Sequence, residues 1–91
     1  MVYGYDEGIL KIDDKTVYFT VKENDVFEKL YKNANKLVSY QELDDIINYG
    51  YGYNGMSYIR TMINRIRTKL GDSVEIINIP SRGYKLYIRN V

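Results

Sequence analysis

The sequence predicts an α+β fold in which three helices lie between short N-terminal antiparallel β-strands and a C-terminal β-hairpin. Two capping-box patterns precede apolar residues with helical spacing, a third such stretch ends at a glycine, and β-prone segments lie at both ends of the chain. A chain of 91 residues buries enough surface for one core only. We therefore expect a single domain over residues 1–91.

The N-terminal segment, residues 2–21, contains short apolar groups on either side of an acidic stretch. Asp13-Asp14-Lys15 separates the two groups. Short apolar runs that flank a cluster of polar turn residues are typical of a β-hairpin. We expect this segment to form a hairpin with an acidic turn.

Two capping boxes mark the starts of the first two helices. Thr20 is followed three residues later by Glu23, and Ser39 by Glu42. In such a pair the hydroxyl accepts a backbone N–H of the helix while the glutamate accepts the N–H of the cap. The apolar residues with helical spacing that should face the core are Val26, Phe27, Leu30 and Tyr31 in the first helix, and Leu43, Ile46 and Ile47 in the second.

Asparagine and glycine mark the boundaries of the helices. Asn33 or Asn35 is expected to supply a left-handed residue at the end of the first helix. Three glycines within residues 50–55 predict a loop, because glycine loses much backbone entropy in a helix. Ser57 is the expected N-cap of a third helix, which Gly71 ends. Its apolar stripe consists of Ile59, Ile63, Ile66 and Leu70.

The C-terminal segment predicts a β-hairpin. Two β-prone runs, residues 74–79 and 84–88, flank Pro80-Ser81-Arg82-Gly83. We expect Gly83 to adopt a positive φ after the turn and Tyr84 to pack the hairpin onto the core. Arg82 should then lie exposed near the tip.

The composition argues against most classes of enzyme. The chain has no histidine and no cysteine, so the commonest general base, the commonest metal ligand and thiolate chemistry are all missing. The adjacent carboxylates, Asp13-Asp14 and Asp44-Asp45, have no neighbouring residues suited to metal binding or acid–base catalysis, and we expect them to be solvated. We expect no enzyme activity, no metal and no cofactor. Early acidic residues and the lack of long apolar runs argue against a signal peptide or a membrane span, so the expected location is cytoplasmic.

Charge is distributed unevenly along the chain. Residues 1–56 contain six lysines and ten acidic residues, a net charge of −4, whereas residues 57–91 contain seven basic and two acidic residues, a net charge of +5. Phosphate contacts require local rather than global positive charge. A basic C-terminal third is therefore compatible with a nucleic-acid partner although the whole chain carries only +1.

The face of the third helix opposite its isoleucine stripe carries cations and hydrogen-bonding groups but no acid. A rotation of about 100° per residue places Thr61, Asn64, Arg65 and Thr68 on this face, Arg60 and Arg67 on one flank and Lys69 near the other edge. Arginine matches guanine or phosphate, asparagine can pair with adenine, and threonine can contact phosphate or a thymine methyl. Together with Tyr58 and Arg82, these residues are the predicted contacts to double-stranded DNA.

The alternative to DNA binding is that this polar face is only solvated surface, as on any amphipathic helix. Two shorter helices before the third and a hairpin after it favour DNA binding, because this order is that of a winged helix-turn-helix, whose hairpin is the wing. The rival hypothesis is a winged-helix protein-interaction module that binds no DNA and in which the arginines are incidental.

Five segments in order resemble the effector domain of OmpR/PhoB-type response regulators over about residues 8–88. They are Phe19-Thr20 with Glu23 and Leu30, residues 38–43 (VSYQEL), residues 63–70 (INRIRTKL), residues 76–79 (IINI) and residues 83–86 (GYKL). The resemblance implies the three-helix fold with a wing, with the third helix as the recognition helix. It also places Arg65, Arg67 and Lys69 at the family's basic positions, which makes them the leading candidates for DNA contacts.

The resemblance also bears on partners and on local departures. It implies that the loop 49–56 contacts RNA polymerase, with Tyr51, Tyr53 and Asn54 as candidates, although such tyrosines more often cover a small core. It further implies weak homodimers on tandem half-sites. This chain departs from the family pattern at the start of the recognition helix, where it has Ser57-Tyr58, and in the wing, where it has Pro80-Ser81. No phosphoacceptor receiver domain is seen, so we expect either the C-terminal half of a longer regulator or a stand-alone form.

Overall fold

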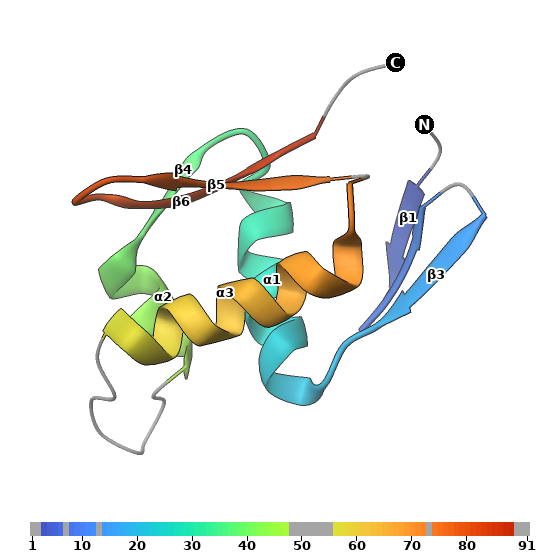
Figure 1. Ribbon diagram of the computed structural model, residues 1–91, viewed down its shortest axis with the longest axis horizontal. Helices are drawn as coiled ribbons and strands as arrows, with labels where there is room; N and C mark the ends of the chain where they lie inside the picture. Colours follow the sequence, from blue (N-terminus) through green and yellow to red (C-terminus); the bar gives the residue numbers. More distant parts are fainter. Residues whose placement is uncertain (1–2, 7, 13, 48–55, 73, 89–91) are drawn as a thin grey trace.

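The computed structural model describes residues 3–6, 8–12, 14–47, 56–72 and 74–88 (Figure 1). Its helices and strands follow one another in the order that the sequence predicts, with two additional strands, β1 and β4. In chain order they are β1 (Tyr3–Asp6), β2 (Ile9–Ile12), β3 (Lys15–Tyr18), α1 (Val21–Lys32), β4 (Leu37–Ser39), α2 (Tyr40–Ile47), α3 (Met56–Leu70), β5 (Glu75–Ile79) and β6 (Gly83–Tyr87).

The N-terminal sheet has the antiparallel order β1-β2-β3. The predicted hairpin is β2–β3, in which Ile12 pairs with Lys15 across the acidic turn. The strand β1 precedes it and was not predicted separately. Gly8, whose φ is +89°, lies between β1 and β2, and this left-handed backbone is easily adopted only by glycine.

The second sheet has the order β4-β6-β5, so the predicted C-terminal hairpin is joined by a strand from between the first two helices. Val38 of β4 pairs with Tyr84 of β6. With only three residues, β4 has no alternation of its own from which it could be predicted. Its partner lies 46 residues further along the chain, a pairing that only the tertiary structure reveals.

The predicted positive φ at Gly83 is wrong, and the positive φ in this turn belongs to Ser81, at +64°. Gly83 is required for a different reason, which is close approach of the backbone of β4. A Cβ atom placed on Gly83 would lie 2.0 Å from the carbonyl oxygen of Val38 and 2.8 Å from the Cα atom of Ser39. No side chain fits there unless β4 moves away from β6.

Both predicted capping boxes are present. At the start of α1 the Glu23 N–H donates to Thr20 Oγ1 at 3.3 Å and the Thr20 N–H donates to Glu23 Oε1 at 2.9 Å. At the start of α2 the Glu42 N–H donates to Ser39 Oγ at 3.1 Å and the Ser39 N–H to Glu42 Oε2 at 2.8 Å. Each box satisfies backbone donors that a helix N-terminus otherwise leaves unpaired.

Of the two asparagines considered for the end of α1, Asn35 has the left-handed backbone, with φ of +65°. Its N–H donates to the Leu86 carbonyl at 2.7 Å, and its Oδ1 accepts the N–H of Ile88 at 3.1 Å. Gly71, with φ of +66°, follows α3 as predicted. Asn35 and Gly71 turn the chain with a left-handed backbone, which glycine and asparagine adopt more easily than other residues.

A continuous apolar core joins the helices to both sheets. In Figure 1, α3 crosses in front of α1, with β5 and β6 along one side of it and the N-terminal sheet near its C-terminal end. The predicted stripe of α3 is buried, and Met62 is buried with it. The helix begins at Met56, one residue before the predicted cap Ser57.

No helix within the described ranges has both the length and the apolar character needed to cross a membrane.

Candidate nucleic-acid interface

The outward face of α3 is exposed along its length. Its buried residues are Ile59, Met62, Ile63, Ile66 and Leu70, and its exposed residues are Arg60, Thr61, Asn64, Arg65 and Thr68. Helical periodicity explains this division, because residues three and four apart share a face. No aspartate or glutamate occurs in the helix. We call these five exposed residues the α3 outer face.

Arg60 and Arg65 extend from the outer face into solvent. Within the part of the chain that the structure describes, neither side chain has a hydrogen bond or an ion pair. A guanidinium keeps its charge at all ordinary pH values and carries five N–H donors. These two side chains are therefore available to an external acceptor, such as a phosphate or the edge of a base.

Thr68 and Asn64 are linked within the helix. The Thr68 hydroxyl donates to the Asn64 backbone carbonyl at 2.9 Å, a bond that orients the threonine side chain along the helix. The hydroxyl hydrogen is used in this bond, so Thr68 offers its oxygen lone pairs and its methyl group outward. Thr61 also lies on the exposed surface.

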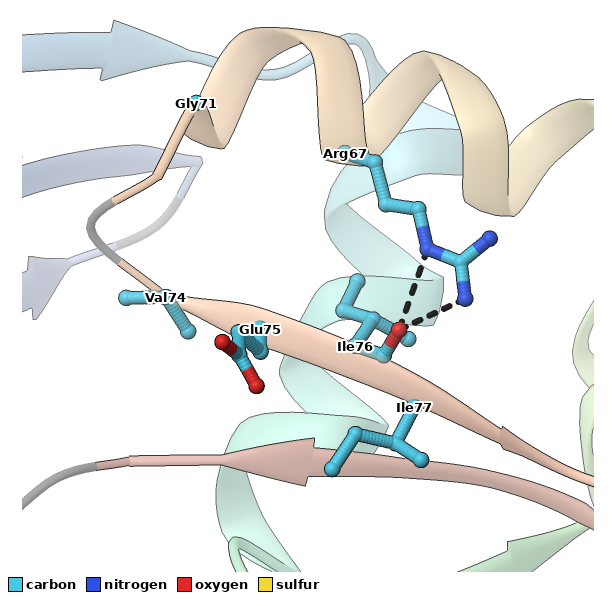
Figure 2. A pocket seen from close by; sticks show the side chains of 6 residues that line it. All are labelled: Arg67, Gly71, Val74, Glu75, Ile76 and Ile77. Carbon is cyan, nitrogen blue, oxygen red and sulfur yellow. Dashed lines mark hydrogen bonds between the residues drawn. The ribbon is translucent and has the colours of Figure 1, made fainter.

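Arg67 is only half-exposed and is directed toward the wing. Figure 2 shows its side chain reaching from α3 to β5, where Nε and Nη2 both donate to the carbonyl oxygen of Ile76, at 3.0 and 2.6 Å. The third nitrogen, Nη1, donates to Asn64 Oδ1 at 3.2 Å. The guanidinium carbon lies 5.7 Å from the ring centre of Tyr84, within the range of a cation–π contact. These contacts join α3 to β5 and β6.

A concave region of about 250 Å³ lies beside this contact, between the C-terminal end of α3 and β5. Its lining residues, drawn in Figure 2, are Arg67, Gly71, Val74, Glu75, Ile76 and Ile77. The region is wide open to solvent and mostly apolar. It is a furrow between a helix and a strand, and it lacks the convergent polar groups of a small-molecule site.

Lys69 is also held within the protein. Its Nζ donates to Glu23 Oε1 at 2.5 Å and to the carbonyl oxygen of Tyr18 at 3.0 Å, so that the end of α3 is tied to the start of α1. Burial by itself would raise the pKa of Glu23. Hydrogen bonds from Lys69 and from the N–H of Thr20, together with the charge of Lys69, outweigh burial and hold that pKa below its ordinary value of 4.5.

Arg82 lies exposed in the wing turn, as expected, and its backbone is anchored to α2. Its N–H donates to the Ile79 carbonyl at 3.0 Å, and its own carbonyl accepts the N–H of Tyr40 at 3.1 Å. The Tyr40 ring meets the buried Tyr84 edge-on at 5.7 Å. The wing turn is therefore attached to the first turn of α2, and Tyr84 packs the hairpin onto the core as predicted.

The remaining predicted contact residues have two kinds of placement. Tyr58 is half-buried and packs against the core near the start of α3. Tyr51, Tyr53 and Asn54, the candidates for the RNA polymerase contact, lie outside the described residues. The structure thus brings the five residues of the α3 outer face onto one surface and leaves Arg82 exposed in the wing turn, whereas Arg67 and Lys69 are turned to partners within the protein.

Two residues that hold α3 and the wing in place were not singled out for these contacts from the sequence. Tyr40 joins α2 to the wing, since its hydroxyl donates to Asn78 Oδ1 at 3.3 Å as well as approaching the Ile79 carbonyl at 3.5 Å. Glu23 was recognised only as part of a capping box, whereas it also pairs with Lys69. No local pattern signals either contact, because each joins elements that are distant in the sequence.

Among the residues that the structure describes, no three acidic, histidine or cysteine side chains converge in a way that could hold a metal ion.

Comparison with known proteins adds a family match. The model of the family "Transcriptional regulatory protein, C terminal" matches residues 14–86, which include all three helices and the wing. A search among curated proteins gave no match. Many solved structures match the fold.

Three of these solved structures illustrate the likeness. The C-terminal domain of the nisin resistance regulator NsrR, a lantibiotic response regulator, is 22% identical with a TM-score of 0.73, over 97% of this chain and 94% of that chain. The DNA-binding domain of Bacillus subtilis CssR is 18% identical with a TM-score of 0.75, over 93% and 99%. The Klebsiella pneumoniae RstA DNA-binding domain, solved with the RstA box, is 17% identical with a TM-score of 0.69, over 93% and 96%. At these identities the likeness establishes the fold.

Proposed function

Because the chain belongs to the family of C-terminal domains of transcriptional regulatory proteins, of the OmpR/PhoB type, we propose that it reads duplex DNA with the outer face of α3. This family comprises the DNA-binding effector domains of two-component regulators, which are not enzymes. We propose further that some residues of α3 contact DNA directly and that others hold α3 in place.

The observation that carries this proposal is the exposure of one uninterrupted face of α3. Arg60, Asn64 and Arg65 lie on it within about two turns of helix, the length that contacts base edges in a major groove. Without acidic residues in the helix, nothing on α3 itself repels a phosphate backbone. The opposite face is fully used by the core, so α3 can present only this side to DNA.

The predicted contact residues divide into two groups. We assign direct contacts to base edges or phosphates to the α3 outer face, with Arg82 of the wing reaching a neighbouring phosphate or groove. Tyr58, Arg67 and Lys69 lie at the margins of this face, and the cationic groups of the last two are engaged within the protein. For these two the main role we propose is to hold α3 against the wing and against α1.

Selection of bound duplexes from a random pool tests the function, and Arg65→Ala tests the assignment of the face. We expect the wild-type protein to enrich one sequence. Arg65→Ala should lose about 1–3 kcal/mol of specific binding because a guanidinium that contacts a base or phosphate is removed. The measurement is the dissociation constant for the enriched duplex, with circular dichroism to confirm that the fold is retained.

Lys11→Ala is the matched control for this experiment, since Lys11 is an exposed cation on β2 and is remote from α3 in the chain. It should bind as the wild type does. Unchanged affinity of Arg65→Ala would show that another surface contacts DNA. Failure of the wild type to bind any duplex, even at low salt, would favour the winged-helix protein-interaction module.

Two finer features of the proposal concern partners. We propose that the domain binds tandem half-sites as a weak dimer, to be tested by the stoichiometry on one and two copies of the enriched site. We also propose that the loop around Tyr51, Tyr53 and Asn54 contacts RNA polymerase, which rests on the family resemblance. Loss of transcription activation with unchanged DNA binding in a Tyr51→Ala, Tyr53→Ala variant would support this contact.

A further inference from the structure

The position of the Arg67 guanidinium is set by the wing. Nε and Nη2 converge on the carbonyl oxygen of Ile76, at 3.0 and 2.6 Å, and the buried ring of Tyr84 lies beside the group. Two donors on one acceptor fix the place of the guanidinium and make its third nitrogen point away from that acceptor, because the nitrogens form a rigid fork. The direction of the third nitrogen, Nη1, is thereby fixed as well.

This third nitrogen determines how the exposed Asn64 amide is turned. Nη1 donates to Asn64 Oδ1 at 3.2 Å. A guanidinium has only donors, whereas an amide carries an acceptor oxygen on one side and a donor nitrogen on the other. If the amide were rotated by half a turn, Nδ2 would face Nη1, donor against donor. Arg67 therefore holds Asn64 with Oδ1 toward the wing and Nδ2 away from it.

The orientation has a consequence for base recognition. Bidentate pairing of asparagine with adenine requires Oδ1 and Nδ2 to meet the base edge together, the oxygen accepting from N6 and the nitrogen donating to N7. Arg67 occupies one of the two lone pairs of Asn64 Oδ1 and turns the C=O toward the wing, so the two amide groups are not presented side by side to a base. The group directed away from the wing, toward a base, is the Nδ2 donor. Exclusion of water from a protein–DNA groove strengthens the Arg67–Asn64 bond, since solvent no longer competes for it.

We propose that Arg67 is a positioning residue that sets the base preference of Asn64. With Arg67 in place, Asn64 acts as a hydrogen-bond donor to the major-groove acceptors of guanine (O6 and N7) or thymine (O4). Without it, Asn64 rotates freely and pairs bidentately with adenine. This inference rests on the proposed placement of α3 in the major groove, and it concerns one base pair of the recognised site.

The test compares Arg67→Lys, Asn64→Ala and the double variant with the wild type. Lysine keeps the positive charge and can reach the Ile76 carbonyl, but its single ammonium lacks the fork that serves Ile76 and Asn64 together. Asn64→Ala identifies the base pair that Asn64 reads, as the position where the preference is lost. Dissociation constants are then measured for four duplexes that differ only at that base pair.

We expect the wild type to prefer guanine or thymine there. Arg67→Lys should move the preference to adenine by about five-fold or more, the lower end of the discrimination that one side-chain–base pair provides. The double variant should show no preference at this position, since the residue that reads the base is absent. Lys11→Ala, which removes an exposed cation of β2 and leaves the Arg67–Asn64 contact intact, should keep the wild-type base at this position.

Three results would overturn the inference. They are an equal loss of affinity for all four duplexes in Arg67→Lys, a wild-type preference for adenine at this position, and an Asn64→Ala variant that keeps every preference. An equal loss in a protein that otherwise binds its site leaves the proposed function standing and removes only this role of Arg67. A wild-type protein that enriches no sequence refutes the proposed function itself.

Discussion

Arg65 and Arg67 are the same kind of residue, two positions apart, and have different surroundings. A separation of two residues turns the side chain by about 200° around a helix, which directs Arg65 to solvent and Arg67 toward β5. Arg65 is exposed, whereas Arg67 donates twice to the Ile76 carbonyl. The fold therefore distinguishes a free binding group from a positioning group where residue type alone does not.

Gly83 shows a residue whose identity is dictated by its neighbour's backbone. We predict that Gly83→Ala destabilises the protein by about 1–3 kcal/mol, the usual cost of overpacking, because its Cβ would lie 2.0 Å from the Val38 carbonyl oxygen. Urea unfolding measures the change. Ser81→Gly, in the same turn, is the control and should be neutral or stabilising, since Ser81 already has a positive φ. A Gly83→Ala midpoint equal to that of the wild type would contradict the close approach of β4 and β6.

At the level of the elements, the capping residues have roles beyond starting a helix. Glu23 completes the capping box of α1 and also accepts a hydrogen bond from Lys69 at the end of α3. Glu23 is 4% exposed, so its charge is stabilised by these partners in place of water. The contact fixes where the C-terminal end of α3 lies relative to α1.

We predict that this contact makes stability depend on acidity. The pKa of Glu23 is lower in the folded protein than the ordinary value of 4.5. A carboxylate of this kind contributes its full stabilisation above its unfolded pKa and loses it as the pH falls through the folded pKa. From pH 7 downward, the free energy of unfolding should therefore fall more in the wild type than in Glu23→Gln, measured by urea denaturation at a series of pH values.

Lys69→Met provides the second arm of this experiment. It removes the ammonium that lowers the pKa of Glu23, while burial, which raises that pKa, remains. The acid-induced loss of stability should then be smaller than in the wild type, because the folded pKa of Glu23 rises toward or above its unfolded value. Identical pH profiles for all three proteins would show that the Glu23–Lys69 pair does not contribute to stability.

On the scale of the whole molecule, opposite net charges lie in different segments of the chain. The recognition helix and wing derive from the segment with a net charge of +5, while the sheets and helices before them derive from the segment with −4. A local basic surface on a nearly neutral protein attracts DNA through that surface alone. The overall charge of +1 therefore understates the electrostatic contribution to binding.

Salt dependence provides a quantitative prediction for this surface. The logarithm of the binding constant should fall linearly with the logarithm of salt concentration, with a slope of about −0.9 per phosphate neutralised. Arg82→Ala should reduce the magnitude of that slope by about one, because the exposed wing cation would be lost from a phosphate. Titrations at several salt concentrations measure the slope, and Lys11→Ala should leave it unchanged. A slope near zero for the wild type would be inconsistent with binding through phosphates.

The sequence by itself predicted the parts of the fold that have local causes. Capping residues, apolar spacing and the glycine after α3 specify where helices start, end and face the core, because these signals act within a few residues. The same periodicity identified the α3 outer face. The order of helices and wing then indicated DNA binding, and the family match is in accord with it.

Only the tertiary structure decided what depends on residues far apart in the chain. The strand β4, the reason for Gly83, the bonds from Arg67 to Ile76 and the partners of Lys69 all involve contacts across at least nine residues, and most across more than forty. A side chain's partners are set by packing, which no local pattern encodes. For this reason the cations of α3 are evident from the sequence, whereas the tertiary structure shows which of them face outward and which hold the domain together.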